Sequence, residues 1–410
     1  GAQMNTYPKT ALVINCGSSS VKFAILNPED GYIFLNGIAE ALGLPEARIS
    51  WKFNGGEKTE TMLGAGADHK KALEFLVKNV LEKDQSLLDS IVACGHRIVQ
   101  GGDIYSQPTL INDEVEENIK KVIPFAPLHN PAHLLGIDAA RANFPKIPHV
   151  AVFDTAFHQT MPPKAYRYAI PEEYYTDLHL RKYGAHGTSH MFLSQEAAKL
   201  LGKPLEETNL ITCHLGNGAS VTAVKGGKCV DTSMGLTPLD GLIMGTRSGC
   251  IDASVVFFLC ERMGMTPDEV KEVLNKKSGM MAVSGVSSDF RPIVAGMNEG
   301  NERCKLALQM YAYRLAKFIA SYYVPLGGHI DAIVFSGGVG ENGPTTRKFV
   351  CAELQEAFGI KLDNEANYNA KVFMGVDKQL ISTPDSKVKV YVIATNEELV
   401  IARSAMSFVK

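Results

Sequence analysis

The chain has 410 residues, which is longer than a typical single domain, so two domains are expected. Its hydrophobic content of 45% and charged content of 21% are those of an ordinary globular protein, and the net charge of −3 argues against a nucleic-acid partner, which normally requires a basic face. The cysteines are scattered without a C-x-x-C pair and no apolar run approaches the roughly 18 residues of a membrane span, so we expect a soluble, cytoplasmic protein with reduced thiols.

The first predicted structure is a β-hairpin whose tip consists of small polar residues. Two apolar, β-branched runs, residues 11–14 and 21–26, flank this tip. The tip itself, residues 15–22, contains three consecutive serines and one lysine. Backbone N–H groups and hydroxyls in such a turn can approach an anion closely. An ordinary Gly/Ser turn fits the same stretch, and the tip alone does not decide between the two interpretations.

Strands and helices alternate along the rest of the chain, which predicts an α/β fold. The predicted strands are residues 32–38, 48–53, 90–94, 149–153 and 389–393. Apolar spacing, N-cap residues and first-turn prolines predict helices over residues 69–83, 130–142, 189–201, 266–277, 301–323 and 395 to about 408.

The chain also resembles itself in three places, always in the same order. The matching pairs are residues 12–21 with 210–221, 89–95 with 331–337, and 150–155 with 390–395. Three ordered matches predict two copies of one βα unit. Two glycine-tipped hairpins facing each other would hold a polyphosphate from both sides. This matters because the chain contains no P-loop motif.

One glycine-rich loop has the spacing G-x-G-x-x-G, at residues 338–343. This pattern is found in dinucleotide-binding proteins when it lies in the first βαβ unit. Here it lies near the end of the chain, without that context. We interpret it as a loop that presents backbone amides at a helix N-terminus.

Polar residues gather at the predicted strand ends, where α/β proteins bind their ligands. The clusters include His96-Arg97, His129-Asn130, Asp154-Thr155, His186 to His190, His214 to Gly218 and Gly245 to Gly249. Two histidine pairs, His129 with His133 and His186 with His190, have the i,i+4 spacing of metal ligands. Neither pair carries the H-E-x-x-H glutamate, so a transition-metal site is disfavoured.

These clusters resemble conserved motifs of the acetate kinase family. The segments that carry the resemblance are residues 15–22, 127–131, 152–158, 183–190, 214–218, 244–249, 336–342 and 395–399. They follow the order of the family from about residue 12 to residue 403. The resemblance implies a duplicated two-domain actin/Hsp70/sugar-kinase-like ATPase fold, related to ribonuclease H, with its active site in the interdomain cleft. It also implies a homodimer that phosphorylates acetate reversibly with ATP and Mg²⁺, or Mn²⁺ in its place, to give acetyl phosphate and ADP.

By the same resemblance we expect two domains with different tasks. Residues 8–154 together with 397–410 would form an N-terminal domain on the acyl-substrate and Mg²⁺ side. Residues 155–396 would form a C-terminal domain that binds the nucleotide and makes the dimer contact.

The chemistry of the implied reaction suggests which residue types are needed. A carboxylate is already ionised at pH 7, so it needs no general base. The obstacle is repulsion between the carboxylate and the γ-phosphate, so catalysis depends on positioning and positive charge. Arg97 and Arg247 are assigned to supply that charge. By resemblance His186 donates to the transferring phosphoryl group, His129 holds the substrate end, and Asp154 orients an arginine or the substrate.

The remaining assignments also follow from the resemblance. Asn15 and Glu397 match the positions associated with Mg²⁺. Val99, Leu128 and Pro238, with Arg97 and His129, would bind the acyl substrate. The expected nucleotide-binding residues are Ser18, Ser20, Lys22, His214, Asn217, Gly218, Asp289, Phe290, Arg291, Gly337, Gly338, Gly340, Glu341 and Asn342.

Two positions depart from the pattern of the family. Ala185 stands where many relatives have Phe, which would leave room for propionate. A methylene changes binding by only about 1–3 kcal/mol, so selectivity by size should be weak. Cys250 follows Arg-Ser-Gly where an Asp is usual, so Arg247 would be held differently.

Three alternatives remain open. A propionate or other short-chain acyl kinase would use the same groups on a larger acid. A sugar or polyol kinase of the same fold would use Asp154 as a general base. A chaperone-like or filament-forming, actin-like ATPase would have no small acceptor, but we see no appended domain that would bind a peptide or form a polymer.

Overall fold

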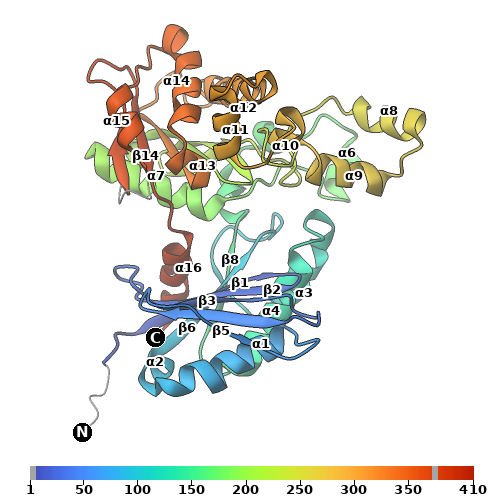
Figure 1. The fold of residues 1–410 in the computed structure, drawn as a ribbon, viewed down its shortest axis with the longest axis vertical. Coiled ribbons are helices and arrows are strands. Elements are labelled where there is room, and N and C mark those ends of the chain that lie inside the picture. Colours follow the sequence, from blue (N-terminus) through green and yellow to red (C-terminus); the bar gives the residue numbers. More distant parts are fainter. Residues whose placement is uncertain (1–5, 372–376) are drawn as a thin grey trace. The chain divides into compact units, whose positions relative to one another are not determined.

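The computed structural model describes residues 6–371 and 377–410. The chain divides into two compact units (Figure 1). Unit 1 contains the described residues up to Gln159 together with Asn396–Lys410, and unit 2 contains Thr160–Thr395. No helix in the described ranges combines the length and the apolar character that crossing a membrane requires.

Unit 1 is built on one mixed sheet with the strand order β5-β4-β3-β2-β1-β6-β8-β7. Its strands are β1 (Thr10–Gly17), β2 (Ser20–Leu26), β3 (Ile33–Glu40), β4 (Arg48–Phe53), β5 (Thr59–Met62), β6 (Ile91–Ile98), β7 (Thr109–Leu110) and β8 (His149–Phe153). Its helices are α1 (His69–Phe75), η1 (Leu76–Val80), η2 (Leu81–Lys83), α2 (Gln85–Ser90), α3 (Asp113–Lys121), η3 (Ile123–Phe125), α4 (Asn130–Asn143), η4 (Ala156–Thr160) and α16 (Glu397–Met406). Strands β1, β6 and β8 are parallel, whereas the other neighbours are antiparallel.

Unit 2 is built on a second mixed sheet with the strand order β11-β10-β9-β12-β14-β13. Its strands are β9 (Asn209–Leu215), β10 (Ala219–Lys225), β11 (Lys228–Thr232), β12 (Ala332–Ser336), β13 (Lys378–Leu380) and β14 (Lys389–Ile393). Its helices are α5 (Pro163–Tyr166), α6 (Glu172–Thr176), α7 (Gly187–Leu201), η5 (Leu205–Glu207), α8 (Ser254–Met263), α9 (Pro267–Lys276), α10 (Gly279–Ser284), α11 (Phe290–Asn298), α12 (Glu302–Ser321), α13 (Gly337–Asn342), α14 (Pro344–Phe358) and α15 (Asn364–Asn369).

The two sheets share one topology, which confirms the predicted duplication. In unit 1 the hairpin β1–β2 continues into β3, and the parallel strands β6 and β8 follow on the other side of β1. In unit 2 the hairpin β9–β10 continues into β11, and β12 and β14 follow beside β9 in the same way. The order β3-β2-β1-β6-β8 therefore matches β11-β10-β9-β12-β14, and the α/β fold expected from the sequence is present.

Helices cover both faces of each sheet. In addition, α7 and α16 each pack on the sheet of one unit, although the last strand before them in the chain belongs to the other unit. Helix α7 comes after β8 in the chain but packs on β9, β12 and β14 of unit 2. Helix α16 comes after β14 but packs on β1, β6 and β8 of unit 1, opposite the face covered by α1 and α4 (Figure 1). The side chain of Ile401 on α16 fills the space above Gly95, whereas Cys16 meets Gly136 of α4. On β6, Gly95 therefore faces α16, whereas its neighbour Cys94 lies in the core cluster that includes Ala139 and Ala140 of α4.

Most predicted elements are confirmed, and two differ. Strands 48–53, 149–153 and 389–393 match β4, β8 and β14. Strand 90–94 is longer than predicted, because parallel pairing with β8 continues to Ile98 opposite Phe153. The predicted helical span 69–83 is confirmed, but its type changes along the chain: α1 ends at Phe75, and a wider turn follows in which Leu81 N–H bonds to Leu76 O. The buried side chains Leu76 and Leu81 both reach the core through this turn.

Candidate active site

The clearest predicted site pair in unit 1 is Arg97 with Asp154. Arg97 lies near the carboxyl end of β6, and Asp154 follows β8 directly, where its N–H bonds to Ile98 O at 2.8 Å. Arg97 donates from Nε to Asp154 Oδ1 (3.1 Å) and from Nη2 to Oδ2 (2.8 Å). The carboxylate of Asp154 raises the pKa of Arg97. Both carboxylate oxygens thus hold the guanidinium, and its Nη1 edge points away from Asp154.

Glu397 lies next to this ion pair, at the start of α16. Asn396 caps the helix by accepting a hydrogen bond from Leu399 N–H (3.2 Å). Burial raises the pKa of Glu397, while the charge of Arg97 lowers it and the charge of Asp154 raises it again. A smaller lowering comes from Lys22, which pairs with Asn15 across the β1–β2 hairpin. The Glu397 carboxylate therefore has an incompletely balanced negative charge, a property that a bound cation would correct.

These donors fit a magnesium ion. Asn15 and Glu397 offer an amide oxygen and a carboxylate oxygen, and Mg²⁺ prefers a few such oxygens with water and phosphate in its other positions. The predicted partners Ser18 and Ser20 lie at the tip of the same hairpin, where Ser20 pairs with Gly17.

The residues predicted to hold the acyl group have unequal exposure. Val99 is buried just after β6, whereas Leu128 is 67% exposed. His129 lies exposed at the N-cap of α4, one turn before the buried His133. Burial lowers the pKa of His133 to about 3, and the charge of Arg97 contributes to this lowering. His133 is therefore neutral at physiological pH and adds no charge beside the Arg97–Asp154 pair.

In unit 2, His186 occupies a strained position at the N-cap of α7. Its φ is +57°, a left-handed conformation that non-glycine residues seldom adopt and that is frequent at functional sites. Its Nδ1 lies 2.8 Å from Ser220 Oγ, and its ring centroid lies 4.3 Å from that of His214. The two predicted histidines are thus brought together, with their Nδ1 atoms turned toward hydroxyl groups of the core.

A chain of hydrogen bonds fixes the ring of His186. Thr212 Oγ1 lies 2.7 Å from His190 Nδ1, and His190 Nε2 lies 2.7 Å from Ser220 Oγ. If Thr212 donates to His190 and His190 donates to Ser220, the Ser220 hydroxyl is free to donate to His186 Nδ1. The proton of a neutral His186 then resides on Nε2. The i,i+4 spacing of His186 and His190, which resembled a metal pair in the sequence, brings both rings within hydrogen-bond distance of Ser220.

His214 is held in a similar way. Ser189 Oγ lies 2.8 Å from His214 Nδ1 and 2.6 Å from Thr395 Oγ1. His214 Nε2 faces the hairpin tip, 3.7 Å from the point where a Cβ on Gly216 would lie. Sequence reasoning missed Ser189, Ser220 and Thr395 as supports of the two histidines. The motif segments 183–190, 214–218 and 395–399 pointed to this region, but not to these hydroxyls as supports.

Arg247 lies against the tip of the second hairpin. A Cβ on Gly218 would lie 3.3 Å from Arg247 Nη1, and this Nη1 donates to Pro238 O at 3.0 Å. Gly245 N–H bonds to Asn217 O at 3.2 Å, so the loop of Arg247 and the hairpin tip are joined. Burial lowers the pKa of Arg247, and within the described ranges no carboxylate is paired with it. Arg247 is thus a half-buried cation without a balancing acid, unlike Arg97.

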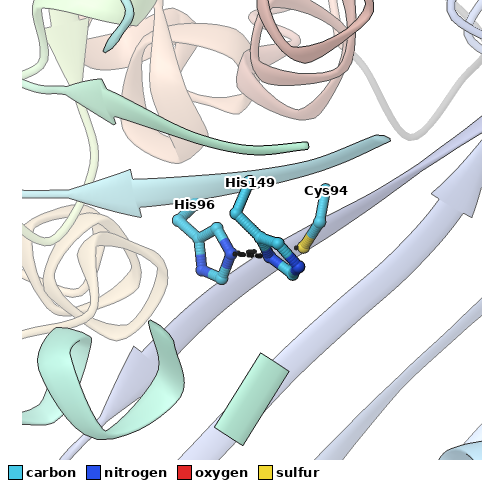
Figure 2. A group of neighbouring side chains, drawn as sticks. All are labelled: Cys94, His96 and His149. Atoms are coloured by element: carbon cyan, nitrogen blue, oxygen red, sulfur yellow. Dashed lines mark hydrogen bonds between the residues drawn. The ribbon is translucent and has the colours of Figure 1, made fainter. Parts of the chain in front are cut away.

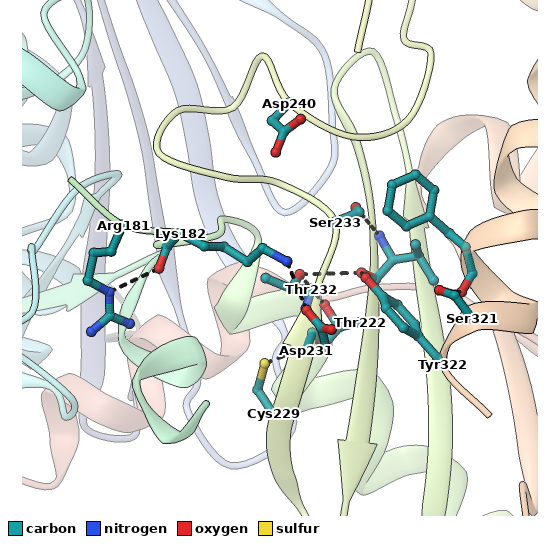
Figure 3. A network of polar contacts seen from close by, with 12 residues as sticks. Arg181, Lys182, Thr222, Cys229, Asp231, Thr232, Ser233, Asp240, Ser321 and Tyr322 are labelled. Carbon is teal, nitrogen blue, oxygen red and sulfur yellow. Dashed lines mark hydrogen bonds and ion pairs between the residues drawn. The ribbon is translucent and has the colours of Figure 1, made fainter. Parts of the chain in front are cut away.

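The loop that carries Arg247 starts from a polar network at the end of β11 (Figure 3). Lys182 Nζ donates to Asp231 Oδ1 at 2.9 Å, and Ser233 Oγ accepts from Val221 N–H at 2.9 Å (Figure 3). Asp240 lies further along the same loop (Figure 3). These bonds hold the start of the loop to β10 and to the segment before α7.

Cys250 does not replace the usual carboxylate as a partner of Arg247. Its Sγ lies 3.3 Å from Asp240 Oδ1, and its N–H bonds to Gly241 O. Arg247 is instead held by the carbonyl of Pro238. The other departure, Ala185, is 3% exposed and packs in the core of unit 2 directly before His186.

The predicted glycine loop closes against β9. Gly337 has φ +77°, and a Cβ there would lie 2.7 Å from the backbone of Leu215, so only glycine fits. Glu341 is buried, and its carboxylate accepts from Ser336 Oγ at 3.4 Å. Burial raises the pKa of Glu341, whereas the backbone N–H groups of Thr395 and Gly337 lower it. Its side chain therefore orders the loop, while the exposed members are Gly338 and Asn342.

The segment of Asp289, Phe290 and Arg291 divides between surface and core. Asp289 caps α11 and pairs with Arg291 Nη2 at 2.7 Å, on the surface. Phe290 packs edge-on against Tyr311, with ring centroids 4.8 Å apart. Phe290 is therefore a core residue of unit 2.

Comparison with known proteins places this geometry in a family. Residues 10–403 match the model of the acetokinase family. The chain is 51% identical over 401 residues to the acetate kinase of Shewanella sp. (strain W3-18-1), and the match covers 98% of each chain. It is 52% identical over 399 residues to the acetate kinase of Proteus mirabilis (strain HI4320), and this match covers 97% of this chain and 98% of that one.

Solved structures agree. The acetate kinase of Porphyromonas gingivalis is similar with a TM-score of 0.92 and 43% identity, covering 98% of this chain and 100% of that one. A propionate kinase from Francisella tularensis subsp. tularensis SCHU S4 is similar with a TM-score of 0.89 and 43% identity, covering 97% and 99%.

Proposed function

Because the chain belongs to the acetokinase family, we infer that it is an acetate kinase, a phosphotransferase that uses ATP and a carboxyl group as acceptor. The observation that carries this proposal is the environment of Arg247. Its half-buried guanidinium has no carboxylate partner among the residues that the structure describes. It lies beside a glycine tip and in the same unit as two histidines held through Nδ1. Such a site attracts the charge that develops on a transferring phosphoryl group.

In unit 1 we assign the acceptor carboxylate to Arg97. Asp154 holds Nε and Nη2, so the remaining edge of the guanidinium is oriented for a second anion. Because both oxygens of Asp154 already accept from Arg97, Asp154 acts as a positioning residue rather than as a base. His129, exposed at the start of α4, would donate to the same carboxylate, with Val99 and Leu128 beside the acyl group.

In unit 2 we assign the phosphoryl groups to Arg247, His186 and His214. A phosphoryl oxygen only accepts hydrogen bonds, so each histidine must present a protonated Nε2. The hydroxyls of Ser220 and Ser189 allow this by donating to the Nδ1 atoms. Arg247 and the histidines then stabilise negative charge without transferring a proton, which an ionised acceptor does not require.

Mg²⁺ would lie at Asn15 and Glu397 and, when bound, neutralises charge on the phosphate oxygens. We propose that the hairpin residues Ser18, Ser20 and Lys22 assist in unit 1. In unit 2, the hairpin tip, the glycine loop and the start of α11 would surround the nucleotide. The residues are Asn217, Gly218, Gly337, Gly338, Gly340, Glu341, Asn342, Asp289 and Arg291, and Phe290 would support this last segment from the core. Unit 1 would thus serve the acyl and metal side, and unit 2 the nucleotide side.

The acceptor is a short-chain carboxylate, and we propose acetate as the preferred acid. The relative named propionate kinase has 43% identity, and Ala185 is a small residue beside His186, so propionate is the second candidate. Comparing kcat/KM for acetate, propionate and butyrate decides between them. We expect a preference of about tenfold for acetate, since one methylene changes binding by roughly 1–3 kcal/mol.

We further propose a homodimer that forms through unit 2. Helix α8 carries large apolar side chains that are between 39% and 66% exposed, namely Val255, Phe257, Phe258 and Met263. Exposed apolar clusters of this kind are typical of protein interfaces. Light scattering of the wild type and of Phe257→Glu tests this, because a charge in the interface should shift the mass to that of a monomer. The eight cysteines, all within the described ranges, form no disulfide bond, which supports a reducing, cytoplasmic location.

The activity is tested by trapping acyl phosphate as hydroxamate in the presence of ATP, Mg²⁺ and acetate. We expect acetohydroxamate from the wild type and a strong loss in Arg97→Ala and Arg247→Ala. Absence of hydroxamate with every C2–C4 acid would overturn the proposal. Activity that requires an alcohol and vanishes in Asp154→Asn would instead support a sugar or polyol kinase.

A further inference from the structure

A cluster of three metal-ligating side chains lies inside unit 1, apart from the proposed catalytic residues. Cys94 and His96 are two positions apart on β6, so they face the same side of the sheet. His149 on β8 is the parallel partner of Cys94. Figure 2 shows the three side chains converging. All three are buried, with 0%, 2% and 6% of their surface exposed.

The spacing of the donor atoms is that of ligands around one ion. Cys94 Sγ lies 3.3 Å from His96 Nε2, and His96 Nε2 lies 3.0 Å from His149 Nδ1 (Figure 2). All three atoms are within 4.8 Å of one another. Ligand atoms that bind one metal at about 2.0–2.3 Å are roughly 3–4 Å apart. Little rearrangement is therefore needed for an ion to sit between them.

Hydrogen bonds within this cluster cannot satisfy all three side chains at once. His149 Nε2 lies 2.8 Å from Phe144 O, and since a carbonyl only accepts, Nε2 carries the proton and Nδ1 presents a lone pair. If His96 Nε2 donates to this lone pair, it cannot accept from the Cys94 thiol. If it accepts from the thiol, two lone pairs face each other at 3.0 Å. A cation could bind the sulfur and one ring nitrogen of each histidine at the same time. The hydrogen bond from His149 Nε2 to Phe144 O would then hold His149 Nδ1 in place as a ligand.

The charge and number of donors select the kind of ion. An imidazole binds a metal through a ring lone pair, so His96 and His149 would be neutral ligands. On binding, the Cys94 thiol loses its proton to solvent and the thiolate bonds to the metal. A monovalent ion then gives a neutral buried site, whereas Zn²⁺ would leave a positive charge near Arg141. Structural zinc almost always takes four ligands, and the cluster in the described ranges offers three.

We propose that Cys94, His96 and His149 form a binding site for one Cu(I) ion in the core of unit 1. Soft thiolate ligands favour Cu(I), and Cys with two His is a trigonal copper set. The site is separate from the proposed reaction: His96 faces α4, whereas the neighbouring Arg97 lies on the opposite face of β6. Copper would bridge β6 and β8 and so stabilise unit 1. The proposal does not depend on the kinase function.

The test measures copper in protein produced with and without added copper, under reducing conditions. Copper also binds surface thiols, so the background variant is Cys250→Ser/Cys260→Ser, which removes the two cysteines that are not buried. In this background we expect about one equivalent of copper per chain, retained against a weak chelator because the site is buried. X-ray absorption should show one sulfur and two nitrogen neighbours.

Three further variants make the result specific to the cluster. Cys94→Ser and His149→Asn should each lower the copper content at least about tenfold. Cys213→Ser, which removes an equally buried thiol on β9 in unit 2, should retain the full equivalent. Circular dichroism and thermal unfolding show whether each variant is folded, and a folded His149→Asn suffices if Cys94→Ser is not.

The proposal is overturned if the background variant holds no stoichiometric copper. It is also overturned if copper persists in folded Cys94→Ser or His149→Asn, or if only sulfur neighbours are seen, since both indicate binding at other thiols. One equivalent of Zn²⁺ with the same dependence on Cys94 and His149 would overturn the assignment to copper. A higher melting temperature with copper, absent in His149→Asn, supports it.

Discussion

Replacing Ser220 by Ala should impair catalysis through the ring of His186, without removing a group that touches substrate. The Ser220 hydroxyl lies 2.8 Å from His186 Nδ1 and 2.7 Å from His190 Nε2. Ser220→Ala removes both hydrogen bonds, and the proton of His186 can then reside on Nδ1. The Nε2 atom would in that case face phosphoryl oxygens with a lone pair, and donation to the transition state would be lost.

The magnitude follows from the energy of these bonds. A neutral hydrogen bond contributes about 1 kcal/mol, and a buried group left unpaired costs about 1–3 kcal/mol. A loss of about 1–2 kcal/mol in the transition state lowers kcat roughly 5- to 30-fold, and the free energy of unfolding should fall by about 1–3 kcal/mol. The KM for ATP should change by less than about threefold, since the orientation of His186 matters mainly in the transition state.

The assay is steady-state kinetics in the direction of acyl phosphate formation, combined with urea unfolding. Ser220→Thr keeps the hydroxyl and should recover most of kcat. The matched control is Thr222→Val, because Thr222 is equally buried on β10 but bonds to Thr232 at 2.8 Å and not to a histidine. It should lose stability with kcat unchanged. A Ser220→Ala enzyme with kcat within about twofold of the wild type would refute this account of His186.

Three other variants test the remaining structural assignments. Arg247→Ala should lower kcat by roughly 10²–10³-fold or more, while calorimetry should show that ATP binding is retained. Near-normal turnover would show that the charge of Arg247 does not stabilise the transition state. Because burial raises the pKa of Glu397, the folded protein loses stability as pH rises through that pKa. Glu397→Gln should therefore raise the melting temperature at pH 8 without Mg²⁺, while it lowers activity. An unchanged melting temperature would contradict the burial argument. Gly337→Ala should lower the free energy of unfolding in urea by about 1–3 kcal/mol, because its Cβ would meet the backbone of Leu215. Gly338→Ala, where the Cβ has open space and φ is not positive, should leave the free energy of unfolding nearly unchanged. Equal effects of the two variants would disprove the steric reason.

Local signals in the sequence account for what was predicted correctly. The Thr266 N-cap with Pro267 begins α9 as expected. Helix α4 also starts at Asn130-Pro131, but its N-cap is His129, and the Asn130 side chain bonds to the backbone of Gln100 and does not cap the helix. Caps, turns and apolar periodicity depend on residues only a few positions apart, so they are readable without the fold. The duplication was readable too, because the same strand order requires the same run of apolar residues and glycines in both halves.

The predictions that failed or were missing concern distant partners. The turn from Leu76 to Leu81 departs from a regular helix, although its apolar spacing is helical. Ser220 was not singled out, because its importance comes from two histidines on another element. The roles of the site residues remain predictions that the variants above address.

The sequence by itself determined the α/β class, the two copies and the family, since these rest on patterns along the chain. Only the tertiary structure decided that both oxygens of Asp154 hold Arg97, that Arg247 has a carbonyl rather than an acid beside it, and that Cys94, His96 and His149 meet. For Arg97 with Asp154 and for the Cys94, His96 and His149 cluster, the reason is the register of the parallel strands β6 and β8. Residues 55 or more positions apart become neighbours through pairing such as Cys94 with His149, and no local pattern specifies which side chains then share a face.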